Sequence, residues 1–112
     1  MKDITVKQNI TISDAMKALN LTAEKCLLVV DENNKLLGTL TDGDLRRSIL
    51  AGENFSAQVT GSFNANPTFL VKGSYTKEEV FELLRSQKLS LIPIVDKKHV
   101  VVDYVIWSAV GG

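Results

Sequence analysis

An internal repeat constrains the fold of this chain more strongly than any other feature of its sequence. Residues 11–31 align with residues 76–96 without a gap, at a constant separation of 65 positions. Apolar positions fall on apolar positions, as Val29 does on Ile94. A repeat of this length is one supersecondary unit, which buries its apolar face against its neighbour. We therefore expect two similar units packed against each other.

Each unit reads as strand, helix, strand, strand and helix. In the first unit, weak alternation over 5–12 predicts a short strand, and Ser13 or Asp14 is placed to cap a helix whose apolar stripe runs from Ala15 to Leu21 and includes Met16. Aliphatic runs predict a hairpin of strands over 26–30 and 35–40. A second helix is expected over 44–51, with Gly52 placed to end it.

The second unit retraces this order. It predicts an extended segment over 67–71, a helix that begins at Thr76, and strands over 89–95 and 100–107. The chain then ends where a helix matching 44–50 would follow, so we expect a fragment of a larger protein. The fold class is α/β (α+β): two pseudo-symmetric β-α-β-β-α repeats packed sheet to sheet. Residues 1–52 form the first repeat, 53–66 a linker and 67–112 the second, together one domain.

Charge and cysteine content disfavour several classes of function. Thirteen basic residues balance 13 acidic ones, so no net field would recruit nucleic acid or an anionic membrane. The apolar runs are too short to span a bilayer, and we expect no signal peptide because the N-terminus enters a polar, alternating segment at once. Cys26 is the only cysteine, which excludes an internal disulfide. We expect a cytoplasmic protein that binds neither nucleic acid nor membrane.

Residues 38–47, Gly-Thr-Leu-Thr-Asp-Gly-Asp-Leu-Arg-Arg, join a strand to a helix. Such a junction places free backbone N–H groups of a positive helix end beside hydroxyl and carboxylate side chains, an arrangement that suits a phosphate and a ribose. Thr41 can contact a phosphate oxygen, and Asp44 can accept from a ribose hydroxyl. The same residues also suit an ordinary helix start, with Thr41 or Asp42 as the N-cap and Asp44 as an acid of the first turn.

The hairpin followed by this stretch resembles a cystathionine-β-synthase (CBS) domain, and the tandem resembles a CBS pair, or Bateman module. In that family the pattern Gly-x-x-Thr-x-x-Asp supplies the Thr that meets phosphate and the Asp that holds the ribose of an adenine nucleotide. The matching residues here are Gly38, Thr41 and Asp44. The resemblance implies a regulatory nucleotide site whose ligand is AMP, ADP, ATP or S-adenosylmethionine.

The second repeat does not keep this pattern. The same separation of 65 positions places Asp103, Ile106 and Ala109 where the first repeat has Gly, Thr and Asp. Ile106 has no hydroxyl and Ala109 no acceptor, so a ribose there would lose its charge-assisted hydrogen bonds. We expect one competent site at most. A one-residue slip in the turn at His99 would change these correspondences.

Several other residues are candidates for lining this site. Arg46 and Arg47 are placed to reach a phosphate, or are solvated charges of an exposed helix. Pro67 and Thr68 are expected to line the cleft by position only, because modules of this family build each site from both repeats. Cys26 begins the strand that would flank a bound base, and packing is its expected role.

The nucleotide-binding residues predicted from the sequence are Gly38, Thr41, Asp44, Arg47 and Thr68. Neither catalytic residues nor a metal site are expected, because no nucleophile and base, P-loop or ligand cluster is visible. The wording of residues 41–47 is similar to the N-terminal regulatory part of sugar-phosphate nucleotidyltransferases and to the C-terminal part of sugar-phosphate isomerases. We therefore expect a regulatory, homodimeric module joined to a catalytic domain. The alternative is a structural dimerisation module without a small-molecule ligand.

Overall fold

The computed structural model describes residues 3–22 and 25–107. Each half of the chain contributes a three-stranded sheet, in the order β1-β2-β3 and β4-β5-β6. In both sheets the central strand is parallel to the first strand and antiparallel to the third. The elements are β1 (Thr5–Lys7), α1 (Ile12–Asn20), β2 (Cys26–Val30), β3 (Leu36–Thr41), α2 (Asp42–Leu50), the 3-10 helix η1 (Val59–Gly61), β4 (Leu70–Val71), α3 (Lys77–Ser86), β5 (Leu91–Val95) and β6 (Val101–Ile106).

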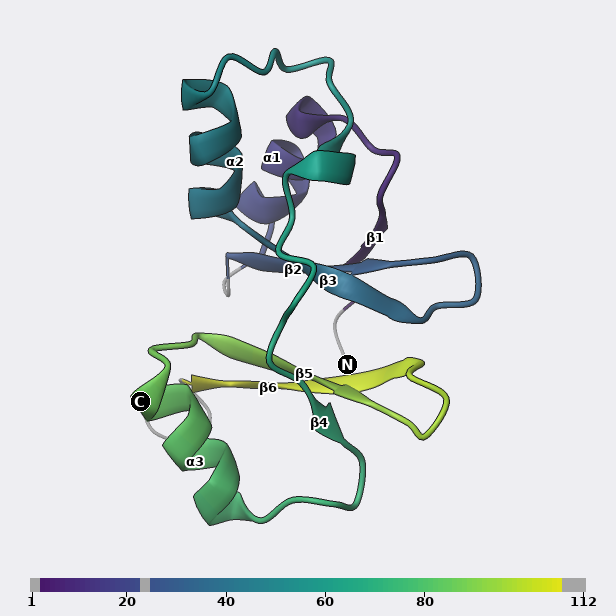
Figure 1. Cartoon of the computed structure of the whole chain (residues 1–112), viewed down its shortest axis with the longest axis vertical. Coiled ribbons are helices and arrows are strands. Elements are labelled where there is room, and N and C mark those ends of the chain that lie inside the picture. Colours follow the sequence, from purple (N-terminus) through teal and green to yellow (C-terminus); the bar gives the residue numbers. More distant parts are fainter. Residues whose placement is uncertain (1–2, 23–24, 108–112) are drawn as a thin grey trace.

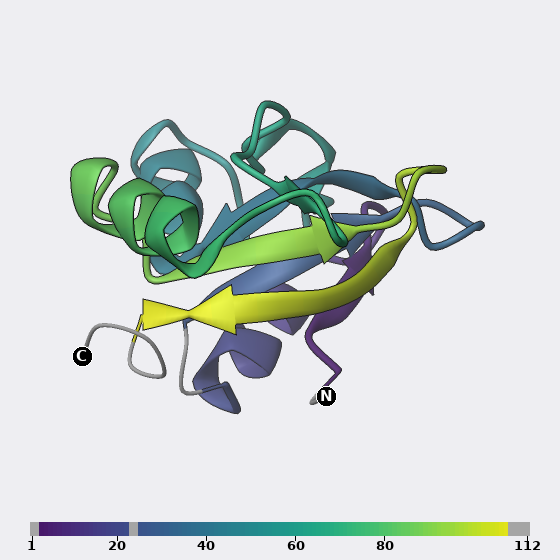
Figure 2. The ribbon, with the colours of Figure 1, turned by 90° about the horizontal axis from the view of Figure 1, so that it is seen from below.

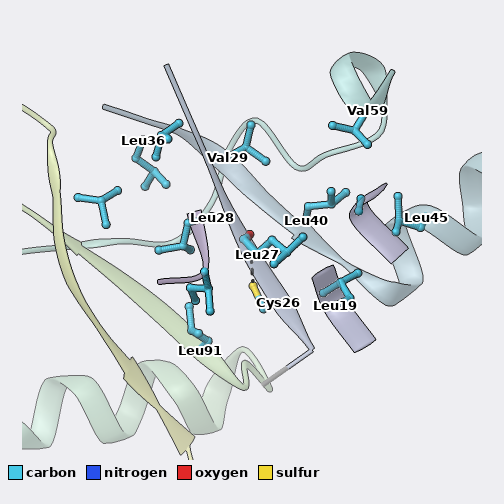
Figure 3. Packing of buried hydrophobic residues seen from close by; sticks show 14 of the residues in the cluster. Leu19, Cys26, Leu27, Leu28, Val29, Leu36, Leu40, Leu45, Val59 and Leu91 are labelled. Atoms are coloured by element: carbon cyan, nitrogen blue, oxygen red, sulfur yellow. Dashed lines mark hydrogen bonds between the residues drawn. The ribbon is translucent and has the colours of Figure 1, made fainter. Parts of the chain in front are cut away.

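The two sheets pack face to face, as the repeat predicted. Helices α1 and α2 cover the outer face of the first sheet, and α3 covers the outer face of the second (Figure 1). Side chains alternate across β2 because successive residues of a strand point to opposite faces. Leu28 points toward Leu91 of the second sheet, whereas Leu27 lies with Leu40 on the side of the helices (Figure 3). The main core therefore runs continuously through both repeats.

The hairpins of the two repeats have the same register. Cys26 pairs with Thr41 in the first hairpin, and Leu91 pairs with Ile106 in the second. Both ladders shift register just before the last residue of the central strand, at Val30 and Val95. The separation of 65 positions therefore continues through the second hairpin, and no slip occurs at its turn.

Both hairpin turns are held by an aspartate at the same repeat position. Asp31 Oδ1 accepts the backbone N–H of Asn33 at 2.8 Å and that of Lys35 at 2.9 Å. Asp96 Oδ1 makes the same two bonds one repeat later, at 2.8 and 3.0 Å. The Lys35 N–H, followed by the Asn33 N–H, holds the pKa of the Asp31 carboxyl below its ordinary value of 3.8. Equivalent backbone bonds lower the pKa of Asp96.

These two aspartates predict a loss of stability in acid. A carboxyl whose pKa is lower in the folded chain stabilises the fold above its unfolded pKa, near 3.8, and loses that contribution as the pH falls through the folded value. The double variant Asp31→Asn/Asp96→Asn keeps an acceptor oxygen in each turn but no charge. We expect wild type to be more stable at pH 7, and the difference to close below pH 4. Denaturant titrations between pH 7 and pH 2.5 measure it, and a constant difference across that range would contradict the prediction.

The start of α1 differs from the expectation. Thr11, not Ser13 or Asp14, is the N-cap, and its Oγ1 accepts the Asp14 N–H at 3.1 Å. Because α1 begins earlier than expected, Ala15 and Leu19 point into the core, and other residues of the expected apolar stripe remain exposed to solvent. Met16 is 40% exposed and Leu21 77% exposed.

The segment over 53–66 is not a free linker. Val59, in η1, is completely buried in the main core. Asn64 also exchanges two backbone hydrogen bonds with Thr39 of β3, at 2.8 and 3.1 Å. The segment therefore packs along the first repeat before it crosses to the second (Figure 1). Backbone hydrogen bonds from Ile12, Ser13 and Val59 hold it as well, so irregular contacts rather than a periodic apolar face fix its position.

Candidate functional site

The predicted site begins where β3 passes directly into α2. Thr41 is the N-cap of the helix, and its Oγ1 accepts the Asp44 N–H at 3.2 Å. Asp44 completes a capping box, since its Oδ2 accepts the Thr41 N–H and the Thr41 hydroxyl, both at 2.9 Å. The structural interpretation of these residues is therefore correct. Whether they also bind a ligand depends on the space around them.

The second oxygen of Asp44 has a different partner. Asp44 Oδ1 accepts from the Arg47 guanidinium, whose side chain is 72% exposed while that of Asp44 is 12% exposed. Ion pairs of exposed side chains contribute little to stability, because solvent screens them. A ribose hydroxyl can therefore replace Arg47 at Oδ1 without opening the capping box. Oδ2 thus belongs to the helix cap, whereas Oδ1 is held by an exposed side chain.

A cleft of about 280 Å³ lies between the two repeats. It opens where β2 and β5 begin and β3 ends, which is the end of the sandwich opposite the hairpin turns. The turns lie side by side at the other end (Figures 1 and 2), where Leu36 N–H donates to the His99 carbonyl at 3.0 Å. The lining residues are Cys26, Thr39, Thr41, Asn64, Asn66, Pro67, Thr68, Gln87, Lys88, Leu89, Ser90 and Leu91.

The predicted site residues take different places around this cleft. Thr41 and Thr68 both line it, and they come from different repeats. The Thr68 hydroxyl donates to Gln87 Oε1 at 2.6 Å. Asp44 lies immediately behind Thr41, joined to its hydroxyl, and Arg47 is held on Asp44. Thr41 and Thr68 are thus at the cleft, Asp44 is one hydrogen bond removed from it and Arg47 is two removed.

Position 38 requires glycine for a structural reason that the sequence did not reveal. A Cβ at this position would lie 2.1 Å from the carbonyl oxygen of Asn64 and 2.5 Å from the ring of Phe63. Gly38 is not among the lining residues of the cleft. Its small size allows the segment after η1 to cross β3, and so it shapes the cleft indirectly.

The loop between α3 and β5 supplies a wall that the sequence analysis missed. Gln87, Lys88, Leu89 and Ser90 line the cleft from the second repeat. Lys88 takes the place of the usual glycine after a helix, with a φ of 54°, and the sequence shows no glycine there to mark this position. The residues that line the rest of the cleft, from Cys26 to Thr68, lie 20 or more positions earlier in the sequence, so no local pattern connects them to Lys88.

The corresponding position of the second repeat lacks the polar groups. Ile106 takes the place of Thr41 by register and brings no hydroxyl. Asp103, at the position of Gly38, accepts the neighbouring Tyr104 N–H at 2.8 Å. Ala109 lies outside the described residues. The register supports a single complete Thr and Asp pair in this chain.

Comparison with known proteins gives the fold a family context. Residues 1–51 match the family model for the CBS domain. The CBS domain pair of protein MJ0100, solved in complex with 5′-methylthioadenosine and S-adenosyl-L-methionine, superimposes with a TM-score of 0.81 at 24% identity, over 95% of this chain and 86% of that one. The fold is that of a CBS domain pair. CBSX2 in complex with AMP also has a TM-score of 0.81, at 23% identity, over 95% of this chain and 82% of that one.

Curated relatives carry similar segments within longer chains. Inosine-5′-monophosphate dehydrogenase of Aquifex aeolicus is 30% identical over 95 residues, which are 85% of this chain and 19% of that protein. Arabinose 5-phosphate isomerase GutQ of Salmonella typhi is 32% identical over 87 residues, 78% of this chain and 27% of that protein. The chain thus spans about a fifth of the first relative and just over a quarter of the second.

Outside the cleft, the most prominent feature of the CBS pair is a groove along α3. Within residues 3–22 and 25–107, no helix has the length and apolar character needed to cross a bilayer, and no group of three metal-ligating side chains gathers. An open groove of about 730 Å³ lies along α3, far from the Thr41 motif in sequence and lined by Tyr75, Lys77, Glu78, Val80, Phe81, Glu82 and Val105. Beside it the rings of Phe81 and Trp107 stack with centroids 5.4 Å apart.

Proposed function

We propose that this CBS pair is the regulatory, nucleotide-binding module of a larger protein, and that its ligand is an adenine nucleotide. The observation that carries the proposal is the placement of the Thr41 and Asp44 capping box at a cleft whose other wall comes from the second repeat. In this proposal residues 1–52 and 67–112 are the two repeats and 53–66 connects them. The module itself performs no catalysis.

The ligands of structural neighbours support the choice of adenine nucleotides. The neighbours' structures contain AMP in one case, and 5′-methylthioadenosine and S-adenosyl-L-methionine in another. The candidate ligands for this chain are AMP, ADP, ATP and S-adenosylmethionine. Asp44 Oδ1 would hold a ribose hydroxyl in exchange for Arg47, and Thr41 and Thr68 would contact the ligand from the two repeats.

The position of the cleft suggests how a ligand would regulate. Backbone hydrogen bonds join the two hairpin turns at one end of the sandwich, and the cleft opens at the other end. A ligand that contacts both repeats would favour one separation of the sheets at the open end. Because a ligand shifts only an equilibrium whose states it binds unequally, this differential contact is the regulatory signal. Couplings of this kind are typically about 1–3 kcal/mol.

A pair of matched variants tests the site. Helix α3 has its own capping box, in which Thr76 and Glu79 make the same bonds that Thr41 and Asp44 make in α2. Asp44→Asn and Glu79→Gln therefore weaken equivalent helix caps, but only Asp44 is bonded to a residue that lines the cleft. At 100 times its dissociation constant, a ligand raises wild-type stability by about 2.7 kcal/mol, which shifts the melting temperature by several degrees.

We expect that shift, measured with AMP, ADP, ATP and S-adenosylmethionine in turn, to persist in Glu79→Gln and to disappear in Asp44→Asn. Equal losses in both variants would show a general effect of helix capping. No shift in wild type with any of the four ligands would refute the adenine-nucleotide site.

The context of the module is a further part of the proposal. We propose a cytoplasmic homodimer attached to a catalytic domain that acts on a sugar phosphate. Residues 41–47 are similar to the regulatory parts of sugar-phosphate nucleotidyltransferases and isomerases, and we propose a nucleotidyltransferase as the parent protein. The match to an arabinose 5-phosphate isomerase supports the broader class of sugar-phosphate enzymes.

The apolar groove on α3 favours a second candidate function, a dimerisation module without a ligand. Phe81 is 39% exposed and stacks on Trp107 at the edge of the groove. A scaffold of this kind would show no nucleotide effect in wild type or in Asp44→Asn, so the same measurement separates the two functions.

A further inference from the structure

The charge of the residues that line the cleft indicates which kind of adenine nucleotide the site prefers. This inference rests on the proposed function. Among the residues that line the cleft, Lys88 is the only one that carries a formal charge. Its side chain is exposed, and its ammonium has no ion-pair or hydrogen-bond partner among residues 3–22 and 25–107. A single free cation facing a small cleft attracts an anionic group.

The backbone at Lys88 strengthens this assignment. The residue follows the C-cap of α3 with a φ of 54°, and the Leu89 N–H donates to the Leu84 carbonyl at 2.9 Å, as in a Schellman motif. Glycine is the residue that adopts this conformation without strain. A lysine here therefore makes the fold less stable than a glycine would. Residues kept in such conformations concentrate at ligand sites.

The opposite side of the site requires such a cation. The Asp44 carboxylate lies 2.9 Å from the Thr41 hydroxyl that lines the cleft. Once a ribose hydroxyl has replaced Arg47 at Oδ1, a phosphate that approached Thr41 would lie close to this negative charge and would be repelled by it. A positive group on the facing wall offsets that repulsion, and Lys88 is the lining residue that provides one.

We propose that Lys88 binds the phosphate of the ligand and that the preferred ligand is a nucleoside monophosphate. The ribose then lies toward Asp44 of the first repeat and the phosphate toward Lys88 of the second. One lysine matches one phosphate group, and a cleft of about 280 Å³ is at the small end of the range for ligand sites. Neutral nucleosides gain nothing from Lys88, and S-adenosylmethionine, with its positive sulfonium, gains less than AMP.

The test compares AMP with adenosine on three proteins by isothermal titration calorimetry and thermal melting. Lys88→Gly removes the cation and relaxes the backbone. Lys25→Gly is the matched control, because Lys25 has a φ of 55° and lies outside the cleft lining. We expect wild type and Lys25→Gly to bind AMP about tenfold to a hundredfold more tightly than adenosine, the usual range for a charge-assisted hydrogen bond.

In Lys88→Gly the preference for AMP should disappear while adenosine affinity stays at the wild-type value. Both glycine variants should melt at a higher temperature than wild type without ligand. A Lys88→Gly protein that keeps its preference for AMP would overturn the role of Lys88 and leave the nucleotide site standing. Tighter binding of ATP than of AMP by wild type would overturn the choice of a monophosphate. If wild type binds neither AMP nor adenosine, both this inference and the proposed function fail.

Discussion

Leu28→Ala is expected to destabilise the CBS pair by about 3–5 kcal/mol, the range for truncating a fully buried leucine. Leu28 is completely buried and lies between the two sheets, near Leu91 of the second repeat (Figure 3). Its truncation removes apolar contacts and leaves a cavity between the facing sheets. Urea denaturation followed by circular dichroism measures the loss, which is a large fraction of the stability of an ordinary domain.

Leu50→Ala is the matched control for that substitution. Leu50 is the last residue of α2 and is 79% exposed, so its truncation leaves no buried cavity. It should change the free energy of unfolding by less than about 0.5 kcal/mol. Similar effects of the two substitutions would contradict the sandwich arrangement, because one leucine would then be no more buried than the other.

Gly38→Ala is expected to destabilise the protein by about 1–3 kcal/mol or more, as overpacking does in a tight site. The added Cβ would lie 2.1 Å from the Asn64 carbonyl oxygen, which is a backbone atom and cannot rotate away. The segment after η1 must then leave β3, and two backbone hydrogen bonds between Thr39 and Asn64 lengthen or break. Because Thr39 and Asn64 both line the cleft, we expect nucleotide affinity to fall as well.

Gly61→Ala tests whether the effect at Gly38 is specific. A Cβ at Gly61 meets no atom within 4 Å, so the substitution should be neutral or stabilising by up to about 1 kcal/mol. Thermal melts of both variants, with and without AMP, provide the comparison. A Gly38→Ala protein as stable as Gly61→Ala would show that the segment after η1 does not hold the position described.

The internal repeat predicted the architecture closely. The expected hairpin strands agree with β2, β3, β5 and β6 to within two residues at each end. Gly52, expected to end α2, has a φ of 105°, and Thr76 caps α3 as predicted. These features depend on neighbours in the sequence: a run of aliphatic residues, a capping residue or a glycine acts within one turn or one strand. The repeat then related the two halves because the same local pattern folds in the same way twice.

For the candidate site, the sequence by itself determined that Thr41 and Asp44 stand together at a helix start and that the second repeat has no equivalent pair. Only the tertiary structure decided what surrounds them. It showed that Arg47 occupies one oxygen of Asp44, that Gly38 makes room for Asn64, and that the loop after α3 forms a wall. Such contacts join segments separated by many residues, and packing rather than local propensity selects them. Lys88 is the example: it lines a cleft that exists only when both repeats are assembled.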